Sequence, residues 1–315
     1  MKYSRSASRS PQANNAPPLP GATRAASGEW IAIAALLAGA VAIAASAIFV
    51  RISETGPVAT AFWRVFLALP WLCSWHAIDR HRNGVPPTTA QERRLLFAAG
   101  CFFAGDLAVW HLSIMFTSVA NSTFLANVAP IFVVLASWLL FAQRISRPFL
   151  AGMALALIGA GMMVGSDFEL GSHELFGDAL GIVTAMFYAA YQMSVTALRR
   201  TTSTARIMAW SGVITAAVLL PLALASGERF LPQTGSGWLK LVGLALTAQV
   251  AGQSLIAYAM AQLRVTFTSV GLLFQPVVAA LLAWWLLGEP MTALQIGGGI
   301  AVLAGIGTAR RAQRK

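Results

Sequence analysis

Long apolar runs, separated by short polar or Gly- and Pro-rich breaks, dominate the chain after its first 28 residues. Each run is about 20 residues long, the length that an α-helix needs to cross the hydrocarbon core of a bilayer. Runs of this length exceed a buried strand and the usual core helix of a soluble protein. The pattern predicts an all-α integral membrane protein with ten transmembrane helices, near residues 30–50, 57–77, 94–114, 119–141, 147–165, 177–198, 206–225, 238–260, 266–287 and 291–309.

The two ends of the chain differ from the apolar runs. Residues 1–28 are rich in Ser, Ala, Pro and Asn and have few large apolar side chains. Such a segment cannot bury enough surface to fold alone, so we expect a disordered cytoplasmic tail. The run from Trp30 to Val50 is longer than the hydrophobic region of a signal peptide, which favours a retained first helix. Residues 310–315 are expected to form a short basic tail.

The composition fits a membrane better than water. The 315 residues are 57% hydrophobic and 10% charged, with a mean hydropathy of +0.68, whereas soluble domains carry roughly 25% charged residues. A net charge of +11 would suit a nucleic-acid partner. However, the basic residues stand in short clusters between apolar runs, and no zinc-finger or RNP pattern accompanies them. We therefore expect no nucleic-acid partner and attribute the charge to membrane topology.

The basic residues alternate with the predicted spans as the positive-inside rule requires. With the N-terminus in the cytoplasm, the outside segments receive only Arg51, Arg229 and Lys240. A wrong number of spans would move later basic loops outside, so the distribution supports ten spans with both termini cytoplasmic. We expect a multi-pass protein of a bacterial inner membrane, with these residues inside: Lys2, Arg5, Arg9, Arg24, Arg80, Arg82, Arg93, Arg94, Arg144, Arg147, Arg199, Arg200, Arg206, Arg264, Arg310, Arg311, Arg314 and Lys315.

The two halves of the chain repeat each other at an offset of 146 residues. Because each half has an odd number of predicted spans, the second half must cross the membrane in the opposite direction to the first. Inverted repeats are typical of secondary transporters, whose substrate site lies near the membrane midplane between the halves. We expect five-helix repeats over residues 29–165 and 177–309, from these matches: Pro130 with Pro276, Leu135 with Leu281, Trp138 with Trp284, Leu140 with Leu286, Gly152 with Gly298, Gly159 with Gly305 and Gly161 with Gly307.

Short motifs recur at matching places in the two halves. The first half reads Thr117-Ser118-Val119-Ala120-Asn121, then Ala129-Pro130 and Trp138-Leu139-Leu140. The second half reads Thr268-Ser269, then Gln275-Pro276 and Leu287-Gly288-Glu289, followed by a Gly-rich last helix.

With these motifs, the chain resembles the drug/metabolite transporter superfamily, with two EamA-type domains over about residues 30–309. One departure is the run 141–144 of the first repeat, Phe-Ala-Gln-Arg, where the family usually has a Gly-Glu pair. Gly288 and Glu289 keep the pair in the second repeat, so we interpret it as a helix-end device. The resemblance implies substrate–proton antiport or facilitated movement of amino acids, metabolites, nucleotide sugars or drugs.

Two charged residues are predicted deep within spans, where a charge costs at least a few kcal/mol and usually faces a cavity or a partner. Arg64 lies in the second span and Asp106 in the third. At a rise of about 1.5 Å per residue they reach a similar depth, so they can form one ion pair. Such a pair serves either as a gate or proton-sensitive switch, or as a structural contact between the two helices.

Polar and aromatic side chains near this pair are candidates for a substrate cavity. Trp110 lies one turn from Asp106 on the same helix face, and His111 follows it, which adds an aromatic surface and a titratable ring. Asn127 precedes Pro130, whose missing N–H frees a backbone carbonyl and favours a bend. Each side chain could instead have a structural role. Trp110 could pack its ring, His111 could be hydrogen-bonded within the fold, and Asn127 could form an inter-helix hydrogen bond.

The second half adds uncharged polar residues near the predicted midplane. Tyr188 with Gln192, and Gln249 with Gln253, are spaced i, i+4, so each pair faces one direction. An amide-and-aromatic pocket with one acid suits a polar or zwitterionic organic solute better than a metal ion, so we expect no metal and no cofactor. Beside the Arg64–Asp106 pair, the candidate cavity comprises Asp106, Trp110, His111, Asn127, Tyr188, Gln192, Gln253 and Gln275.

No P-loop, HExxH or GxSxG motif is present, so the sequence predicts neither ATP-driven transport nor an enzyme. We predict a secondary transporter that exports small organic metabolites, such as amino acids, by alternating access, with protons as the candidate coupling ion. The alternative is a non-transporting membrane protein that uses the same fold to bind a ligand or assist a partner. Two GxxxG pairs, Gly161 with Gly165 and Gly177 with Gly181, allow close helix contact inside a monomer or in a weak homodimer.

Overall fold

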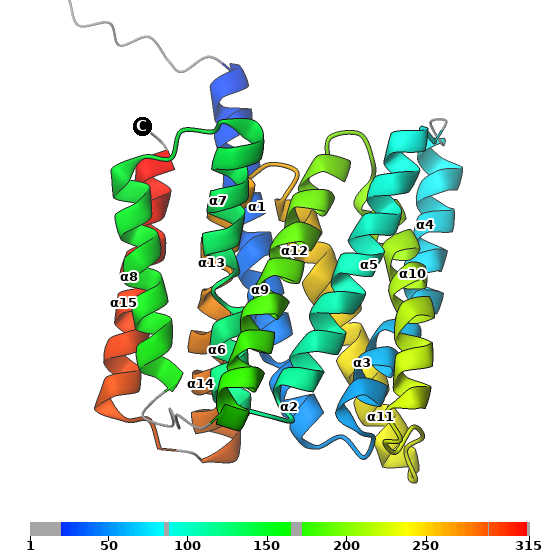
Figure 1. Ribbon diagram of the computed structural model, residues 1–315. Coiled ribbons are helices and arrows are strands. Elements are labelled where there is room, and N and C mark those ends of the chain that lie inside the picture. The colour runs from blue at the N-terminus through cyan, green and yellow to red at the C-terminus, as the bar shows by residue number, and fades with distance from the viewer. Residues whose placement is uncertain (1–19, 85–87, 165–171, 289, 314–315) are drawn as a thin grey trace, which may run out of the picture.

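The computed structural model describes residues 20–84, 88–164, 172–288 and 290–313, which form a bundle of helices (Figure 1). Within these residues every regular element is helical. The first half of the chain forms α1 (Pro20–Ala44), α2 (Ser46–Arg51), α3 (Pro57–Phe66), α4 (Leu69–Asn83), α5 (Ala90–Ser113), α6 (Val119–Ala126), α7 (Ala129–Phe141) and α8 (Arg147–Val164). The second half forms α9 (Ser172–Leu198), α10 (Thr204–Ala225), α11 (Gly235–Leu244), a π-helix η1 (Ala245–Gln253), α12 (Ser254–Ala259), α13 (Val265–Gly271), α14 (Phe274–Leu287) and α15 (Ala293–Gln313).

Membrane-length stretches account for most of these helices. Nine stretches of the described residues are long and apolar enough to cross a membrane, and the shorter apolar helix Arg147–Met163 follows the fourth of them. These stretches follow the predicted spans along the chain, and several consist of two shorter helices in line, such as α3 with α4. The predicted all-α membrane fold is therefore confirmed.

Large apolar side chains cover much of the outside of the bundle. Trp138 on α7 is 58% exposed, and Trp284 on α14 is 54% exposed. In water a surface this apolar would drive association, whereas lipid chains cover it in a bilayer. Trp138 and Trp284 are 146 residues apart, so both repeats turn the same face outward.

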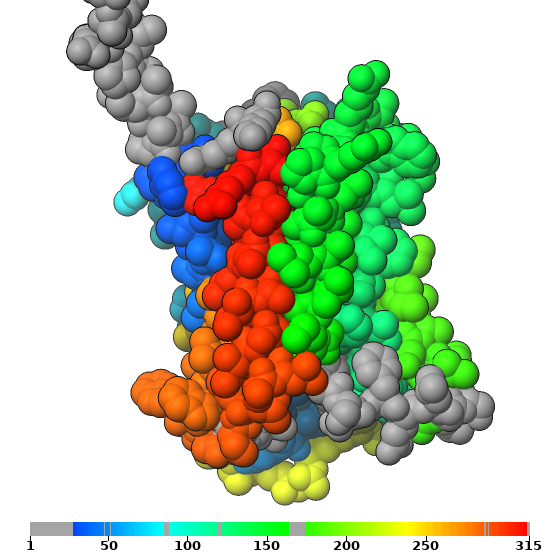
Figure 2. All heavy atoms as spheres, turned by 90° about the vertical axis from the view of Figure 1, so that its left-hand side faces the viewer, coloured from blue at the N-terminus to red at the C-terminus, as the bar shows by residue number. Residues whose placement is uncertain are grey.

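The two repeats run in opposite directions. α1 leaves the face of the bundle that carries both described ends of the chain, whereas α9, which opens the second repeat, runs toward it (Figure 1). We call this face, which holds the start of α1 and the end of α15, the terminal face, and the other the opposite face. α8 and α15, the last helices of the two repeats, lie side by side and antiparallel (Figure 2). The predicted inverted repeats are therefore confirmed.

Glycines that are equivalent in the two repeats make the contact between α8 and α15. Gly159 packs against Gly298, and Gly152 packs against Gly305. Under the 146-residue offset, Gly152 is equivalent to Gly298 and Gly159 is equivalent to Gly305. A two-fold axis between the repeats produces this reciprocal pairing. Since the two helices are antiparallel, the pseudo-two-fold axis between them lies in the plane of the membrane.

Two spans are broken at equivalent places. α6 ends at Ala126 and α7 begins at Ala129, while α13 ends at Gly271 and α14 begins at Phe274. A proline follows each break within the first turn, Pro130 in α7 and Pro276 in α14, and it lacks the N–H that would continue the helical ladder. The expected bend before Pro130 is thus a break. Discontinuous helices at corresponding places in two repeats are a feature of transporter binding sites.

Both ends of the helical region differ from the prediction. α1 begins at Pro20, so residues 20–28 are helical rather than part of a disordered tail. Proline is favoured in the first turn of a helix, and the Ala-rich run that follows favours helix. α15 continues to Gln313, so most of the expected basic tail belongs to the last helix, where cationic side chains suit the negative end of the helix dipole. Residues 1–19 lie outside the described residues.

Candidate functional site

Arg64 lies at the centre of a polar cluster inside the bundle. It interacts electrostatically with Asp106 and His111 of α5 and with Tyr188 and Tyr191 of α9. Because Arg64 belongs to α3, the cluster joins two spans of the first repeat to the first span of the second. The structure therefore brings together residues that lie far apart in the sequence, most of which the sequence singled out.

Arg64 and Asp106 do not form the direct ion pair that we expected. They interact through space, but Arg64 also faces the two tyrosines of α9, and no ion pair with a described residue involves either charge. Both side chains are partly accessible although protein surrounds them. A charge in such a position faces other protein groups rather than lipid, because a lipid-facing charge would be too costly. Two opposite charges thus stand inside the bundle without a direct ion pair between them.

Stacked aromatic rings form one side of the cluster around Arg64. Tyr191 is 2% exposed, and its ring stacks on Phe103 with the centroids 4.8 Å apart. The ring of Tyr188 lies 6.1 Å from that of Tyr191, and such pairs contribute about 0.5–1.5 kcal/mol beyond the area they bury. The side chain of Tyr188 also interacts with Gln253 of η1. These contacts therefore extend from α5 through α9 to η1.

His111 is almost fully buried and is held by its own helix. Its side chain is 3% exposed, and Nδ1 lies 2.5 Å from the carbonyl oxygen of Leu107. Because a carbonyl only accepts, Nδ1 carries a hydrogen in this contact, and Nε2 has no partner among the described residues. The ring of Trp110 packs edge-on against His111 at 4.8 Å between centroids. Nε2 is therefore a buried nitrogen without a partner among the described residues.

Buried amides extend the polar character into the second repeat. Gln192 of α9 and Gln249 and Gln253 of η1 are 1%, 1% and 3% exposed, and the Oε1 atom of each lacks a partner in the described part of the chain. Buried polar groups are normally paired, since leaving one unpaired costs about 1–3 kcal/mol. Two of these amides belong to a π-helix, a geometry that frequently marks functional sites. They are therefore candidates for ligand contacts.

Two of the predicted cavity residues are less clearly connected to this cluster. Asn127 stands at the break between α6 and α7, and its Nδ2 donates to the carbonyl of Thr123 in its own helix at 2.8 Å. Gln275 is half-buried at the corresponding break in the second repeat. Their placement at equivalent breaks agrees with the repeat, while a role in the cavity stays a prediction.

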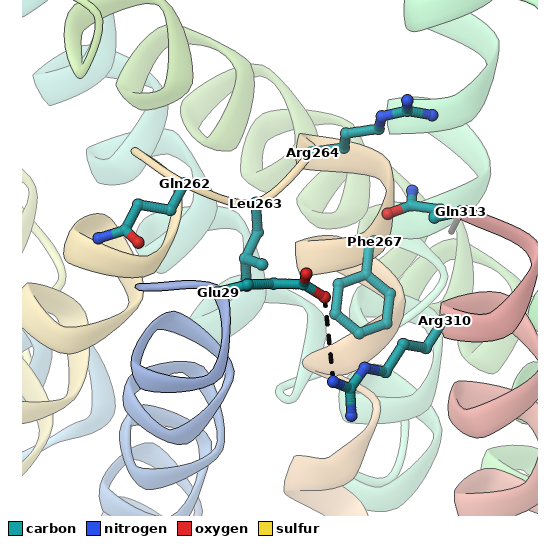
Figure 3. Close-up of a pocket in the computed structure, with 7 residues that line it drawn as sticks. All are labelled: Glu29, Gln262, Leu263, Arg264, Phe267, Arg310 and Gln313. Atoms are coloured by element: carbon teal, nitrogen blue, oxygen red, sulfur yellow. Dashed lines mark ion pairs between the residues drawn. The ribbon is translucent and has the colours of Figure 1, made fainter. Parts of the chain in front are cut away.

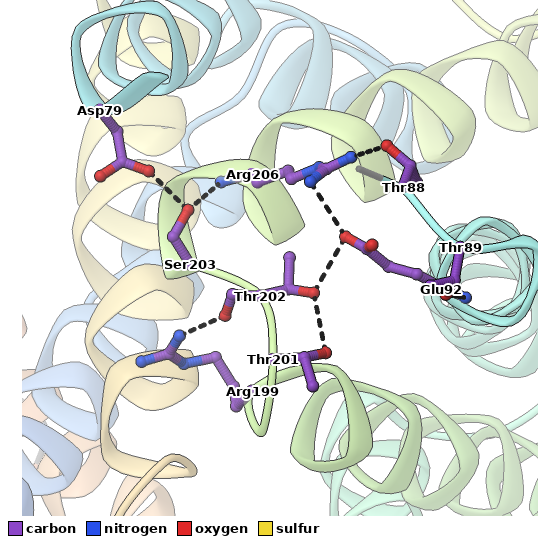
Figure 4. Close-up of polar contacts among 9 residues, drawn as sticks. All are labelled: Asp79, Thr88, Thr89, Glu92, Arg199, Thr201, Thr202, Ser203 and Arg206. Carbon is purple, nitrogen blue, oxygen red and sulfur yellow. Dashed lines mark hydrogen bonds and ion pairs between the residues drawn. The ribbon is translucent and has the colours of Figure 1, made fainter. Parts of the chain in front are cut away.

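The sequence interpretation missed a polar network at the terminal face (Figure 4). The Nη1 atom of Arg206 in α10 lies 3.3 Å from the Oε1 atom of Glu92 in α5, and both side chains are 10% exposed. Thr202 donates to the same carboxylate at 3.0 Å, and Ser203 donates to Asp79 of α4 at 2.6 Å. This terminal network, Asp79, Glu92, Thr202, Ser203 and Arg206, ties the loop between α9 and α10 to α4 and α5.

A second network lies at the opposite face. Glu54, in the loop after α2, accepts hydrogen bonds from the hydroxyl of Thr234 at 2.6 Å and from the N–H of Gln233 at 3.1 Å. The N–H of Val58 donates to Glu228 at 2.9 Å. The hydrogen bond from Thr234, more than any other contact, lowers the pKa of Glu54 from its ordinary value. This opposite network ties the α2–α3 loop to the loop between α10 and α11.

The two networks occupy equivalent positions of the inverted repeats. With the 146-residue offset, loop 52–58 corresponds to 198–204, and segment 79–92 corresponds to 225–238. Each network therefore joins the loop after the first span of one repeat to the loop after the second span of the other. The sequence analysis explains the charges of these loops by topology alone. The available signal was a pair of threonines one offset apart: Thr88, whose hydroxyl accepts a hydrogen bond from Arg206, and Thr234, whose hydroxyl donates to Glu54.

Both repeats match a known family. The EamA-like transporter family matches residues 30–165 and 175–309, which together cover most of the chain. The chain belongs to the EamA-like transporter family. It is therefore a member of the drug/metabolite transporter superfamily, as its motifs predicted. Solute carrier family 35 also matches, over residues 108–225.

Relatives of this EamA-like transporter are named for transport. An uncharacterised transporter of Archaeoglobus fulgidus is 27% identical over 273 residues, 87% of this chain and 94% of that protein. The pseudopaline exporter CntI of Pseudomonas aeruginosa is 24% identical over 222 residues, 70% of this chain and 74% of the exporter. A solved crystal structure shares the fold, with a TM-score of 0.73 at 19% identity over 93% of this chain and 98% of that chain. The protein is a multi-pass membrane transporter.

Proposed function

We propose that this EamA-like transporter is a secondary transporter that exports small polar organic metabolites, such as amino acids, across a bacterial inner membrane by alternating access. The cluster around Arg64 carries the proposal, because it puts separated charges between spans of two inverted repeats. Transporters of this architecture bind substrate near the midplane, where the repeats face each other. We take the terminal face as cytoplasmic, since most basic loop residues belong to it.

The chemistry of the cluster favours a solute with both an acidic and a basic group. Arg64 offers a guanidinium that suits a carboxylate, and Asp106 offers a carboxylate that suits an ammonium group. The buried Oε1 atoms of Gln192 and Gln253 add hydrogen-bond acceptors. A zwitterion satisfies these groups together, whereas a purely apolar solute would leave the charges unpaired at high cost.

The two networks supply a means of opening the faces in turn. Each consists mainly of hydrogen bonds and ion pairs between loops and the adjoining helix ends, and these polar groups can bond to water when the contacts break. Opening of the terminal network would admit solute from the cytoplasm, and opening of the opposite network would release it. Export as the direction rests on the similarity to the pseudopaline exporter.

The test is flux. Protein reconstituted in proteoliposomes should exchange a radiolabelled amino-acid mixture across the membrane, and Arg64→Gln and Asp106→Asn should each reduce the rate at least tenfold. Arg200→Gln removes an exposed charge of the α9–α10 loop outside the terminal network and should leave the rate unchanged. Ligand binding without flux would instead favour the alternative, a non-transporting ligand-binding or accessory protein on the same fold.

A further inference from the structure

A pocket of about 460 Å³ opens on the terminal face, separate from the cluster around Arg64. It lies between α1 near Glu29, the turn that joins α12 to α13, and the end of α15 (Figure 3). None of its residues belongs to the cluster or to either network, so the transport mechanism does not account for it. The lining comprises Glu29, Gln262, Leu263, Arg264, Phe267, Arg310 and Gln313.

The polar lining suits a phosphate group. Arg264 and Arg310 offer planar guanidinium groups, whose N–H donors match the oxygens of a phosphate. Gln262 and Gln313 add amide groups on either side. Glu29 is the only acidic residue of the lining, so cationic groups outnumber anionic ones. The pocket therefore favours a ligand with net negative charge.

Arg310 is held in position within the pocket. Its guanidinium lies 3.7 Å above the ring of Trp30, and its Nη2 atom lies 3.9 Å from a carboxylate oxygen of Glu29. Figure 3 shows Glu29 and Arg310 pointing toward each other beside Phe267. The Nε2 of Gln313 donates to the hydroxyl of Thr266 at 3.0 Å. Positioning these groups in advance reduces the side-chain entropy that the protein loses when a ligand binds.

The pocket lies where the apolar spans end. The first span begins at Gly28 and the last ends at Gln313, so the lining sits at the level of the membrane–water interface. Trp30, a residue type enriched at that interface, is 52% exposed, and Ile31 of α1 and Leu303 of α15 are also exposed apolar side chains. Polar groups above an apolar surface match the head and the acyl chains of a phospholipid. Basic pockets between transmembrane helices bind lipid headgroups in this manner.

We propose that this pocket binds the headgroup phosphate of an anionic glycerophospholipid, with Arg264 and Arg310 on the phosphate and the acyl chains along α1 and α15. The site is distinct from the substrate cavity and does not depend on the proposed direction or coupling of transport. A soluble phosphate ester would satisfy the same guanidinium groups. The test must therefore distinguish binding of the intact lipid from binding of a soluble phosphate ester.

Binding can be measured by native mass spectrometry of the full-length protein released from detergent. The probes are phosphatidylglycerol, phosphatidylcholine with the same acyl chains, and soluble glycerol 3-phosphate. We expect phosphatidylglycerol to bind more tightly than phosphatidylcholine, and Arg264→Gln to weaken it about five- to tenfold, the effect of losing one cationic contact to an anionic headgroup. Arg311→Gln is the matched control. Arg311 is exposed at the end of α15, next to Arg310, and does not line the pocket.

The controls distinguish lipid binding in the pocket from general charge attraction and from binding of a soluble phosphate ester. Retained phosphatidylglycerol binding in Arg311→Gln, with weaker binding in Arg264→Gln, would support the proposal. Equal losses in the two variants would show general attraction to surface charge and overturn it. Glycerol 3-phosphate that competes for the site as well as the lipid does would assign the pocket to a soluble phosphate ester instead. Equal midpoints of thermal unfolding for the two variants would exclude misfolding as the cause of a loss.

Discussion

Gly159 and Gly298 meet where α8 crosses α15, so closely that a Cβ added at either glycine would lie 2.6 Å from the carbonyl oxygen of the other. Small residues allow transmembrane helices to approach in this way, and dispersion contacts between their backbones then hold them together. Because one glycine belongs to each repeat, the crossing joins the two halves of the protein. The second pair, Gly152 and Gly305, repeats the contact about two turns away.

A side chain at this crossing should destabilise the protein. Gly298→Val would force a branched side chain against the backbone of α8, and overpacking of this kind costs about 1–3 kcal/mol. Thermal unfolding in detergent should show a lower midpoint. Gly307→Ala is the control on the same helix, because a Cβ there meets nothing within 4 Å, and alanine should maintain or raise stability. An unchanged midpoint for Gly298→Val would mean that α8 and α15 do not pack so closely.

The terminal network should contribute to stability through its buried pair. Removing one member, as in Glu92→Ala, leaves the guanidinium of Arg206 without its carboxylate, which typically costs about 3–5 kcal/mol for a buried pair. The midpoint of thermal unfolding should fall. Arg206→Ala should lower it as well, and the double variant should lose less than the sum of the two. Additive losses would show that Glu92 and Arg206 act independently.

The membrane fold could be predicted from the sequence because its signals are long and redundant. A span is recognised from about 20 apolar residues, and the match of Pro130 with Pro276 specifies a repeat that the structure reproduces as two equivalent helix breaks. The network at Glu92 and Arg206 could not be predicted in the same way. Charged residues at span ends serve topology whether or not they are paired, and only the three-dimensional arrangement selects their partners.

The sequence could single out residues of the cluster around Arg64, but not their arrangement. A buried charge is unusual enough in a span to single out Arg64 and Asp106 from the sequence alone. Depth along a helix fixes the height of each residue, but the rotation of the helices decides which side chains meet. Arg64 is shared between Asp106 and the tyrosines of α9, and this sharing replaces the direct ion pair that helix depth suggested.

The opposite network should weaken in acid because it depends on the ionised form of Glu54. The hydrogen bond from Thr234 contributes most to lowering its pKa below the ordinary value of 4.5, burial opposes this, and the N–H groups of Gln233 and Thr234 and the charge of Lys240 act in the same direction as Thr234. A group whose pKa is lowered by folding stabilises the protein fully above its unfolded pKa, and the stabilisation disappears as the pH falls through the folded pKa.

Glu54→Gln tests this dependence. At about pH 7 the variant should unfold at a lower temperature than the unaltered protein, and the difference should shrink once the pH falls below about 4.5. Thermal unfolding of both proteins in one detergent over this range gives the measurement. A difference that persists unchanged in acid would indicate that the charge of Glu54 does not stabilise the opposite network.

Arg64 and Asp106 should be coupled energetically although they are not in direct contact. Leaving either charge alone inside the bundle is costly, so Arg64→Ala and Asp106→Ala should each reduce the folded yield, and the double variant should recover part of the loss. The yield of monodisperse protein after purification is the measurement. Losses that simply add would mean that each charge has its own partner and that the cluster around Arg64 does not act as a unit.

Proton coupling, if this transporter uses it, should depend on Asp106. It is the only carboxylate in the middle of a described span, and an antiporter needs a group that binds a proton on one side of the membrane and releases it on the other. Because no direct ion pair holds Asp106, the approach of a cationic solute and of a proton can compete for the same carboxylate. His111 is the other candidate, since its Nε2 has no partner among the described residues.

We expect an imposed pH gradient to accelerate flux into proteoliposomes, and Asp106→Asn to abolish the acceleration while His111→Gln retains it. Flux that ignores the gradient in the unaltered protein would point to facilitated diffusion. An Asp106→Asn variant that still responds to the gradient would remove Asp106 from proton coupling and leave it with the binding of solute.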